Sequence, residues 1–144
     1  MQFDSRASKI MIVDHDRTTL EMVQIRLDVA GFHPLAARSS RAALEVLETS
    51  RPDALILERN LPDMDGMALL RAMAALPGRS VPVLLVGRNL AAEDVRAGVQ
   101  LGVRDCLAKP FSGAVVLERL TRMLKRGGAP AAPTNARPAV YINA

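Results

Sequence analysis

In the stretch KIMIVDHD at residues 9–16, residues 10–13 are all apolar and residues 14–16 are all polar. A strand that is buried on both faces of a parallel sheet and ends in a polar loop has this pattern. The next segment, residues 18–30, carries apolar side chains at three- and four-residue spacing and stops at Gly31, as an amphipathic helix does. The chain is therefore expected to begin with one strand–helix unit.

The same unit recurs along the chain. Further strands are expected at residues 32–36, 54–57, 81–86 and 103–108, and further helices at about 39–50, 67–75, 91–100 and 112–126. Pro34 cannot donate to a central ladder, so the second strand belongs at an edge of the sheet. Short connections between alternating strands and helices predict an α/β fold, a doubly wound parallel sheet of five strands with five helices. Reaction sites in such sheets lie beyond the carboxyl ends of the strands.

The expected organisation is one folded domain with two extensions. Residues 1–8 form an N-terminal extension, residues 9–126 the domain, and residues 127–144 a tail rich in Gly, Pro and Ala that is expected to be flexible. The tail ends in AVYINA, a short apolar patch. It is either a disordered end or a linear motif that docks on this domain or on a partner.

Composition excludes several classes of protein. Of the 144 residues, 49% are hydrophobic and 24% charged, as in globular domains, and no apolar run approaches the roughly 18 residues of a membrane span. No signal-peptide pattern begins the chain, so a soluble, cytoplasmic protein without a membrane partner is expected. The single cysteine, Cys106, excludes an internal disulfide. The lack of Trp argues against a stacking platform for nucleic acid, and no DNA-binding motif is present.

Three motifs carry a resemblance to a known family: Ile12-Val13-Asp14, the run LPDMDG at residues 61–66, and Lys109-Pro110-Phe111. With them, the chain resembles the receiver domain of two-component response regulators, the single-domain chemotaxis type included. The resemblance implies a flavodoxin-like receiver fold with strand order 2-1-3-4-5. It also implies an aspartate that accepts a phosphoryl group at the end of the third strand, two acids that hold Mg²⁺, a hydroxyl ending the fourth strand and an aromatic switch residue in the fifth.

This sequence departs from that pattern at four positions, which makes it a degenerate, or pseudo-receiver, form. The phosphoacceptor position holds Glu58, the second acidic position His15, the hydroxyl position Gly87 and the switch position Cys106. What remains of the reactive set is Asp14, Lys109 and the backbone carbonyl of Asn60. Cys106 is expected to be a small buried apolar residue, with redox sensing as the alternative.

Glu58 is longer than aspartate by one methylene, which moves its carboxylate deeper into the pocket. In-line transfer depends on near-attack geometry, and a misplacement of about 1 Å costs roughly two orders of magnitude in rate. A glutamyl phosphate is therefore expected to form poorly. The sequence leaves open whether Glu58 mimics the phosphorylated state or is a structural replacement. In either case an ion pair between Lys109 and Glu58 is expected.

Charge counting argues against a tight Mg²⁺ site, and no cofactor is expected. Asp14 and Glu58 are balanced in part by Lys109, and Arg88 adds a second positive charge if it turns inward. Mg²⁺ prefers oxygen ligands, so His15 is a poor substitute. Its neighbour Asp16 is the nearest acid that can step in. The remaining metal alternative is Zn²⁺ bound by Asp14, His15 and Glu58.

The leading hypothesis is a phosphorylation-independent bacterial signalling adaptor without enzymatic activity. The resemblance implies that it contacts partners through the fourth helix, fifth strand and fifth helix. The partner would be a kinase, a response regulator, or a motor or protease component. The side chains expected on that face are Glu93, Asp94, Arg96, Val99, Arg104, Glu118, Arg119 and Arg122.

Two alternatives stay open. In the first, Arg88, Arg96 and Arg104 bind an anionic small molecule such as a cyclic dinucleotide, because guanidinium groups clamp phosphates and pair with guanine. In the second, the chain is a working phosphorylatable response regulator that uses Asp63 or Asp65. These two acids lie within the loop rather than at the strand end, which argues against them.

Overall fold

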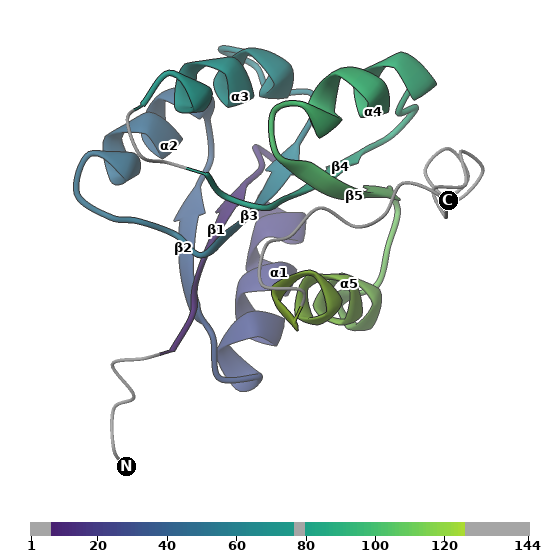
Figure 1. The fold of residues 1–144 in the computed structure, drawn as a ribbon. Coiled ribbons are helices and arrows are strands. Elements are labelled where there is room, and N and C mark those ends of the chain that lie inside the picture. The colour runs from purple at the N-terminus through teal and green to yellow at the C-terminus, as the bar shows by residue number, and fades with distance from the viewer. Residues whose placement is uncertain (1–6, 77–79, 126–144) are drawn as a thin grey trace.

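The computed structural model describes residues 7–76 and 80–125, which form a parallel five-stranded sheet between two layers of helices (Figure 1). The strand order is β2-β1-β3-β4-β5, so the expected fold class and strand order are confirmed. Along the chain the elements are β1 (Lys9–Val13), α1 (Arg17–Val29), β2 (His33–Ala37), α2 (Ser40–Leu47), β3 (Ala54–Glu58), α3 (Gly66–Ala74), β4 (Val83–Gly87), α4 (Ala92–Val99), β5 (Val103–Ala108) and α5 (Gly113–Lys125).

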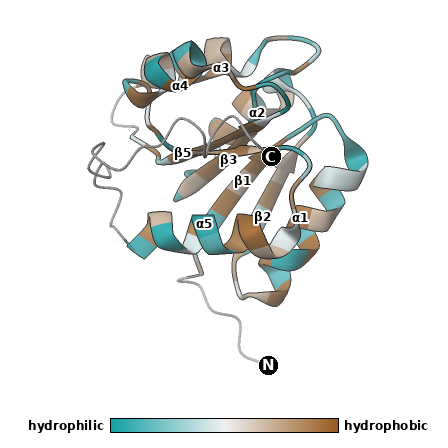
Figure 2. Cartoon of the chain, turned by 90° about the vertical axis from the view of Figure 1, so that its right-hand side faces the viewer, coloured by the Kyte–Doolittle hydropathy of each residue, from teal (hydrophilic) through white to brown (hydrophobic). Residues whose placement is uncertain are grey.

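Alternate residues of the central strands point to opposite faces and build two cores. On one face Met11 and Val13 join the cluster covered by α2, α3 and α4. On the other face Ile10 and Ile12 pack under α1 and α5 (Figure 1). Figure 2 shows apolar strands enclosed between helices whose outer surfaces are largely hydrophilic. Burial on both faces accounts for the continuous apolar runs in the sequence.

Strand β2 pairs with β1 alone, so Pro34 lies in an edge strand, as expected. The chain passes from β1 outward to β2 and then returns to the other side of β1, where β3 pairs. The carboxyl ends of β1 and β3 therefore flank the point at which the strand order reverses. In open α/β sheets this is the place for a functional site.

Most element boundaries shift from the expected positions by one to three residues. β2 begins at His33 rather than at residue 32, because the Phe32 amide donates to the Leu27 carbonyl and closes the end of α1. β4 runs from Val83 to Gly87 instead of 81–86, since its ladder with β5 extends to the pair Gly87 and Ala108. Gly31, with φ of +94°, adopts the left-handed conformation that ends α1.

Some of the expectations from the sequence lie outside the described residues. They concern residues 1–6 of the N-terminal extension, Arg126 and the whole tail at 127–144 with its terminal motif. Within the described part of the chain, no helix has the length and apolar character needed to cross a membrane.

Candidate functional site

A cluster of three charged residues lies at the carboxyl ends of β1, β3 and β5, and is called here the Asp14–Glu58–Lys109 cluster. The Lys109 ammonium lies 2.7 Å from Asp14 Oδ2 and 2.5 Å from Glu58 Oε1. Both carboxylates are buried, with exposures of 1% for Asp14 and 3% for Glu58. The Lys109–Glu58 ion pair expected from the sequence is present, and Lys109 also binds Asp14.

The second carboxylate oxygen of Glu58 is held by the backbone. Glu58 Oε2 accepts a hydrogen bond of 2.8 Å from the Asn60 amide. A Cβ atom at Gly87 would lie 3.1 Å from the same oxygen, closer than most real Cβ contacts. The longer side chain of Glu58 is thus accommodated because position 87 has none. Asn60 contributes its amide hydrogen here, a role that sequence reasoning missed.

Lys109 stays protonated in this setting. Burial of the ammonium lowers its pKa, but the hydrogen bonds to Asp14 and Glu58 outweigh that effect, and the net pKa is raised. Among the described residues, no buried side-chain nitrogen or oxygen lacks a hydrogen-bond partner. The cluster is therefore internally satisfied.

His15 and Asp16, both expected near the pocket, lie at its edge. The His15 side chain is 53% exposed, and its Nδ1 is 3.9 Å from Asp14 Oδ1. Asp16 is exposed and caps α1, accepting hydrogen bonds from the Thr18 amide at 3.2 Å and the Thr19 hydroxyl at 2.7 Å. The Thr19 hydroxyl lowers the pKa of Asp16. In this structure the Asp16 carboxylate caps α1 and lies at the rim, so its role as a pocket acid stays a prediction.

The cluster does not fit Mg²⁺ in this arrangement. Asp14 Oδ1 accepts from the Asp16 amide, and the other three oxygens of Asp14 and Glu58 accept from Lys109 or Asn60. Mg²⁺ demands about six oxygen ligands in near-ideal octahedral geometry. Within residues 7–76 and 80–125, no three His, Cys, Asp or Glu side chains gather in a way that could hold a metal ion. The expectation that Mg²⁺ binds weakly stays a prediction.

The three candidate anion-binding arginines lie on different elements of the fold. Arg88 is exposed just beyond the end of β4, so it does not turn into the cluster, and Arg96 is exposed on α4. Arg104 lies near the start of β5, half-buried and engaged in an interaction. The β4–β5 register separates Arg88 from Arg104 by about four strand residues, or roughly 13 Å. Anion binding by these arginines stays a prediction.

Cys106, at the switch position, is fully buried in the core. Burial raises the pKa of its thiol to about 12. Because the thiolate is the reactive form, burial disfavours reaction of this thiol. This agrees with the expected role of a small apolar core residue rather than a redox sensor.

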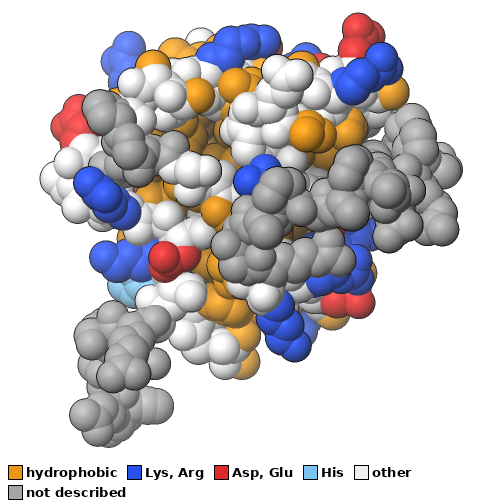
Figure 3. All heavy atoms as spheres, in the orientation of Figure 1, with side chains coloured by type: hydrophobic (Ala, Val, Ile, Leu, Met, Phe, Trp, Pro, Cys, Tyr) orange, Lys and Arg blue, Asp and Glu red, His pale blue; other side chains and the backbone are white. Residues whose placement is uncertain are grey.

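Two residues expected on the partner-facing surface are bound within the fold. Arg59 Nε donates to Asp94 Oδ2 at 3.0 Å and its Nη2 donates to Asp94 Oδ1 at 3.1 Å. Arg119 on α5 pairs with Asp105 of β5 at 3.1 Å. Arg59 had no role in the sequence analysis, since nothing in the sequence shows where a loop arginine points. On the surface visible in Figure 3, Lys and Arg side chains are dispersed and form no single basic patch.

The two acids offered as alternative phosphoacceptors are both engaged at helix starts. Asp63 accepts hydrogen bonds from the backbone amides of Ser40 at 3.1 Å and Arg41 at 2.9 Å. Asp65 is the N-cap of α3 and accepts from the Ala68 amide at 2.9 Å. Neither carboxylate belongs to the cluster.

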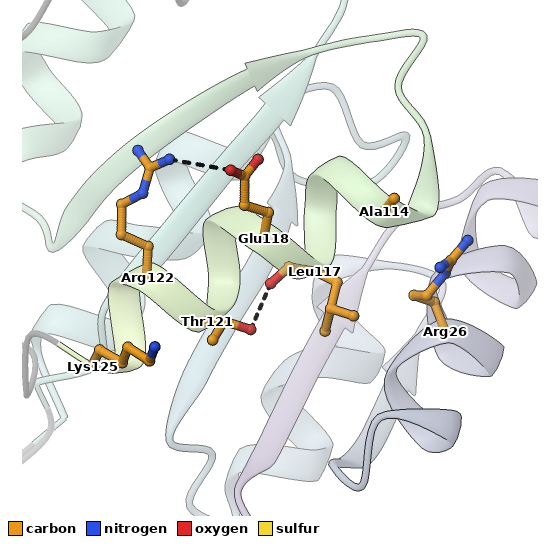
Figure 4. A pocket seen from close by; sticks show the side chains of 7 residues that line it. All are labelled: Arg26, Ala114, Leu117, Glu118, Thr121, Arg122 and Lys125. Atoms are coloured by element: carbon orange, nitrogen blue, oxygen red, sulfur yellow. Dashed lines mark hydrogen bonds and ion pairs between the residues drawn. The ribbon is translucent and has the colours of Figure 1, made fainter.

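A groove of about 510 Å³ runs between α1 and α5, away from the cluster (Figure 4). Arg26 lines it from α1, and Leu117, Glu118, Thr121 and Arg122 line it from α5. Glu118 and Arg122 form an ion pair of 3.6 Å, and Thr121 donates to the backbone of Leu117. The sequence analysis did not identify this groove, because it depends on how two helices lie together.

Comparisons with known proteins agree with this geometry. Residues 10–121 match the response regulator receiver domain family. The chain is 32% identical over 123 residues to the transcriptional regulatory protein PrrA of Mycobacterium leprae, covering 85% of this chain and 52% of that protein. It is 34% identical over 119 residues to the response regulator MprA of Mycolicibacterium vanbaalenii, covering 82% and 51%. The chain thus spans about half the length of these curated relatives.

Solved structures give the same result. The chemotaxis response regulator CheY4 of Vibrio cholerae matches with a TM-score of 0.75 and 27% identity, over 81% of this chain and 98% of that one. A receiver domain of a signal transduction histidine kinase from Syntrophus aciditrophicus matches with a TM-score of 0.73 and 30% identity, over 88% and 96%. The family match, the strand order and the position of the cluster agree, and the chain belongs to the receiver domain family of two-component response regulators.

Proposed function

We propose that this receiver domain is a phosphorylation-independent signalling adaptor of a bacterial, cytoplasmic pathway, with no enzymatic activity of its own. The observation that carries the proposal is the state of Glu58 at the acceptor position. One of its oxygens binds Lys109 and the other binds the Asn60 amide. The pocket is filled by the protein's own carboxylate.

Phosphoryl transfer to Glu58 would have to start from a carboxylate whose two oxygens already accept from Lys109 and from the Asn60 amide. The attacking oxygen needs a free lone pair in line with the phosphorus, and catalysis of such transfer rests on positioning and on metal-assisted charge stabilisation. Here Lys109 is shared between Asp14 and Glu58, and His15 stands at the position where the family has a second acid. The arrangement favours a fixed ion-pair cluster over a reactive centre.

The partner is a protein of the signalling pathway: a kinase, another response regulator, or a motor or protease component. Exposed Glu93, Arg96 and Val99 on α4 offer it mixed charge around an apolar side chain that is 53% exposed. Asp94 and Arg119 are held in ion pairs within the domain, so their role on this face is to fix its shape.

The test is phosphorylation with acetyl phosphate and Mg²⁺, followed by intact mass spectrometry. We expect wild-type protein to gain no phosphoryl group. The matched variant Glu58→Asp shortens the side chain and reports whether the rest of the pocket can still react. Phosphorylation of wild-type protein that disappears in Glu58→Gln would overturn the proposal.

A second candidate is a working receiver whose phosphorylation controls transcription through a further domain or partner. It is favoured by the names of the relatives, transcriptional regulatory proteins, and by the retained Asp14 and Lys109 in contact inside the pocket. The same mass measurement separates the two candidates. A phosphoryl group mapped to Glu58 supports the second one.

The cyclic-dinucleotide hypothesis gains no support from the described residues, because Arg88 and Arg104 lie near opposite ends of adjacent strands. It stays a prediction, tested by calorimetric titration with cyclic diguanylate. No heat at high concentration of the dinucleotide would end it.

A further inference from the structure

An arginine directly after the acceptor position reaches across the sheet to α4. Arg59 follows β3, and its guanidinium binds Asp94, the third residue of α4, through two hydrogen bonds of 3.0 and 3.1 Å. Its Nη1 also lies 3.7 Å from Asp65, the N-cap of α3. The two-point contact between guanidinium and carboxylate is the geometry that gives such pairs both strength and direction.

The backbone of Arg59 is fixed as firmly as its side chain. Its amide donates to the Val86 carbonyl at 2.8 Å, and its carbonyl accepts from the Gly66 amide at 2.8 Å. A Cβ atom at Gly66 would lie 2.6 Å from the Glu58 carbonyl, so only glycine allows this close approach of α3 to β3. Arg59 is therefore a rigid anchor that connects the end of β3 to α4.

The path of Arg59 toward α4 passes Gly87. A Cβ atom at position 87 would lie 3.4 Å from Arg59 Cβ, 3.1 Å from Glu58 Oε2 and 3.1 Å from Leu90 Cδ2. The absent side chain thus leaves room for Glu58 and Leu90, whereas the contact with Arg59 Cβ would be an ordinary van der Waals one. The loss of a side chain at position 87 fits the longer side chain of Glu58.

Asp94 also has a second role, at the start of α4. Its Oδ2 also accepts from the Ala91 amide at 3.4 Å, so the carboxylate that binds Arg59 helps to begin α4. Ala91 has no side chain with which to cap the helix. The start of α4 therefore depends on a side chain that is itself held by Arg59.

We propose that Arg59 is the positioning residue that sets α4, by its two-point ion pair with Asp94. The contact couples the end of β3 to α4, the helix of the proposed partner-facing surface, without a phosphoryl group. The role of this contact in signalling rests on the proposed function. The stabilisation of α4 by Arg59 can be tested without a partner or a phosphodonor.

The experiment is amide hydrogen exchange of the full chain, wild type against Arg59→Ala and Arg59→Lys. Loss of one well-aligned ion pair should accelerate exchange in residues 92–99 by about fivefold. Arg59→Lys keeps the charge but lacks the two-point geometry, so it should show most of that acceleration. The matched control is Arg119→Ala, which removes an equivalent pair between α5 and β5 and should leave α4 within about twofold of wild type.

Asp94→Asn gives an independent check, because it removes the same ion pair from the other side. It should accelerate exchange in α4 as Arg59→Ala does, and the two changes combined should not add. Unchanged exchange of α4 in Arg59→Ala, or equal acceleration in every helix, would overturn the inference. A phosphorylated wild-type protein with a loosened α4 in Arg59→Ala would instead refute only the proposed function.

Discussion

Replacing Lys109 with methionine removes the single positive charge that lies between two buried carboxylates. Asp14 Oδ2 and Glu58 Oε1 both contact the same nitrogen, so they lie within about 5 Å of each other. Two unit charges at that distance repel by about 3 kcal/mol at an effective dielectric constant of 20. Removing one member of a buried ion pair typically costs about 3–5 kcal/mol. Lys109→Met is therefore expected to lower the free energy of unfolding by about 3–5 kcal/mol at pH 7.

Urea denaturation at pH 7 measures the loss. Lys125→Met, at an exposed lysine near the end of α5, is the control and should stay within about 0.5 kcal/mol of wild type.

The double variant Lys109→Met, Glu58→Gln removes one of the two negative charges as well as the lysine. It should recover much of the stability that Lys109→Met loses. A deficit below about 1 kcal/mol would refute the reasoning that Lys109 neutralises a buried carboxylate pair.

Gly87→Ser should lower the free energy of unfolding by about 1–3 kcal/mol in urea denaturation, because the new side chain crowds Glu58. Adding Glu58→Asp to this variant should recover part of the loss. Additive effects of the two substitutions would contradict the steric account. Asp16→Ala should cost about 1 kcal/mol in the same assay, because α1 loses its N-cap, and no change would show that the cap is dispensable. The hydrogen-bonded ion pair with Arg59 lowers the pKa of Asp94 from 3.8. The stability that this ion pair adds is therefore present above that pH and is lost as the pH falls. Asp94→Asn should make the free energy of unfolding less dependent on pH in acid. Cys106 should resist alkylation in the folded protein and react after unfolding, and rapid native labelling would argue against its burial.

Much of the fold follows from local patterns. Burial on both faces makes the central strands continuously apolar, and Pro34 identifies the edge strand because it cannot donate to a ladder. The ends of elements were less predictable. Phe32, for example, reads as strand in the sequence but closes α1 through its amide, a choice made by backbone hydrogen bonding rather than by residue type.

The candidate site was predictable as far as charge and chain order determine it. The ion pair between Lys109 and Glu58 follows from opposite charges at the carboxyl ends of β5 and β3, on the same edge of the sheet. The capping role of Asp16 and the reach of Arg59 to Asp94 do not follow, because each depends on the direction of a side chain within a folded loop. Arg88 directly follows Gly87 in the sequence, which suggested a side chain near the cluster, but it is exposed in the structure.

The most direct test of the central claim is a two-dimensional amide NMR spectrum of labelled protein, recorded before and after adding Mg²⁺ and beryllofluoride. If Glu58 and Lys109 form a closed, unreactive cluster, amide signals from residues 14–16, 58–60 and 109 should not shift. Shifts concentrated at these residues and spreading to α4 would show that the pocket still accepts a phosphoryl analogue, and the claim of phosphorylation-independent function would be wrong.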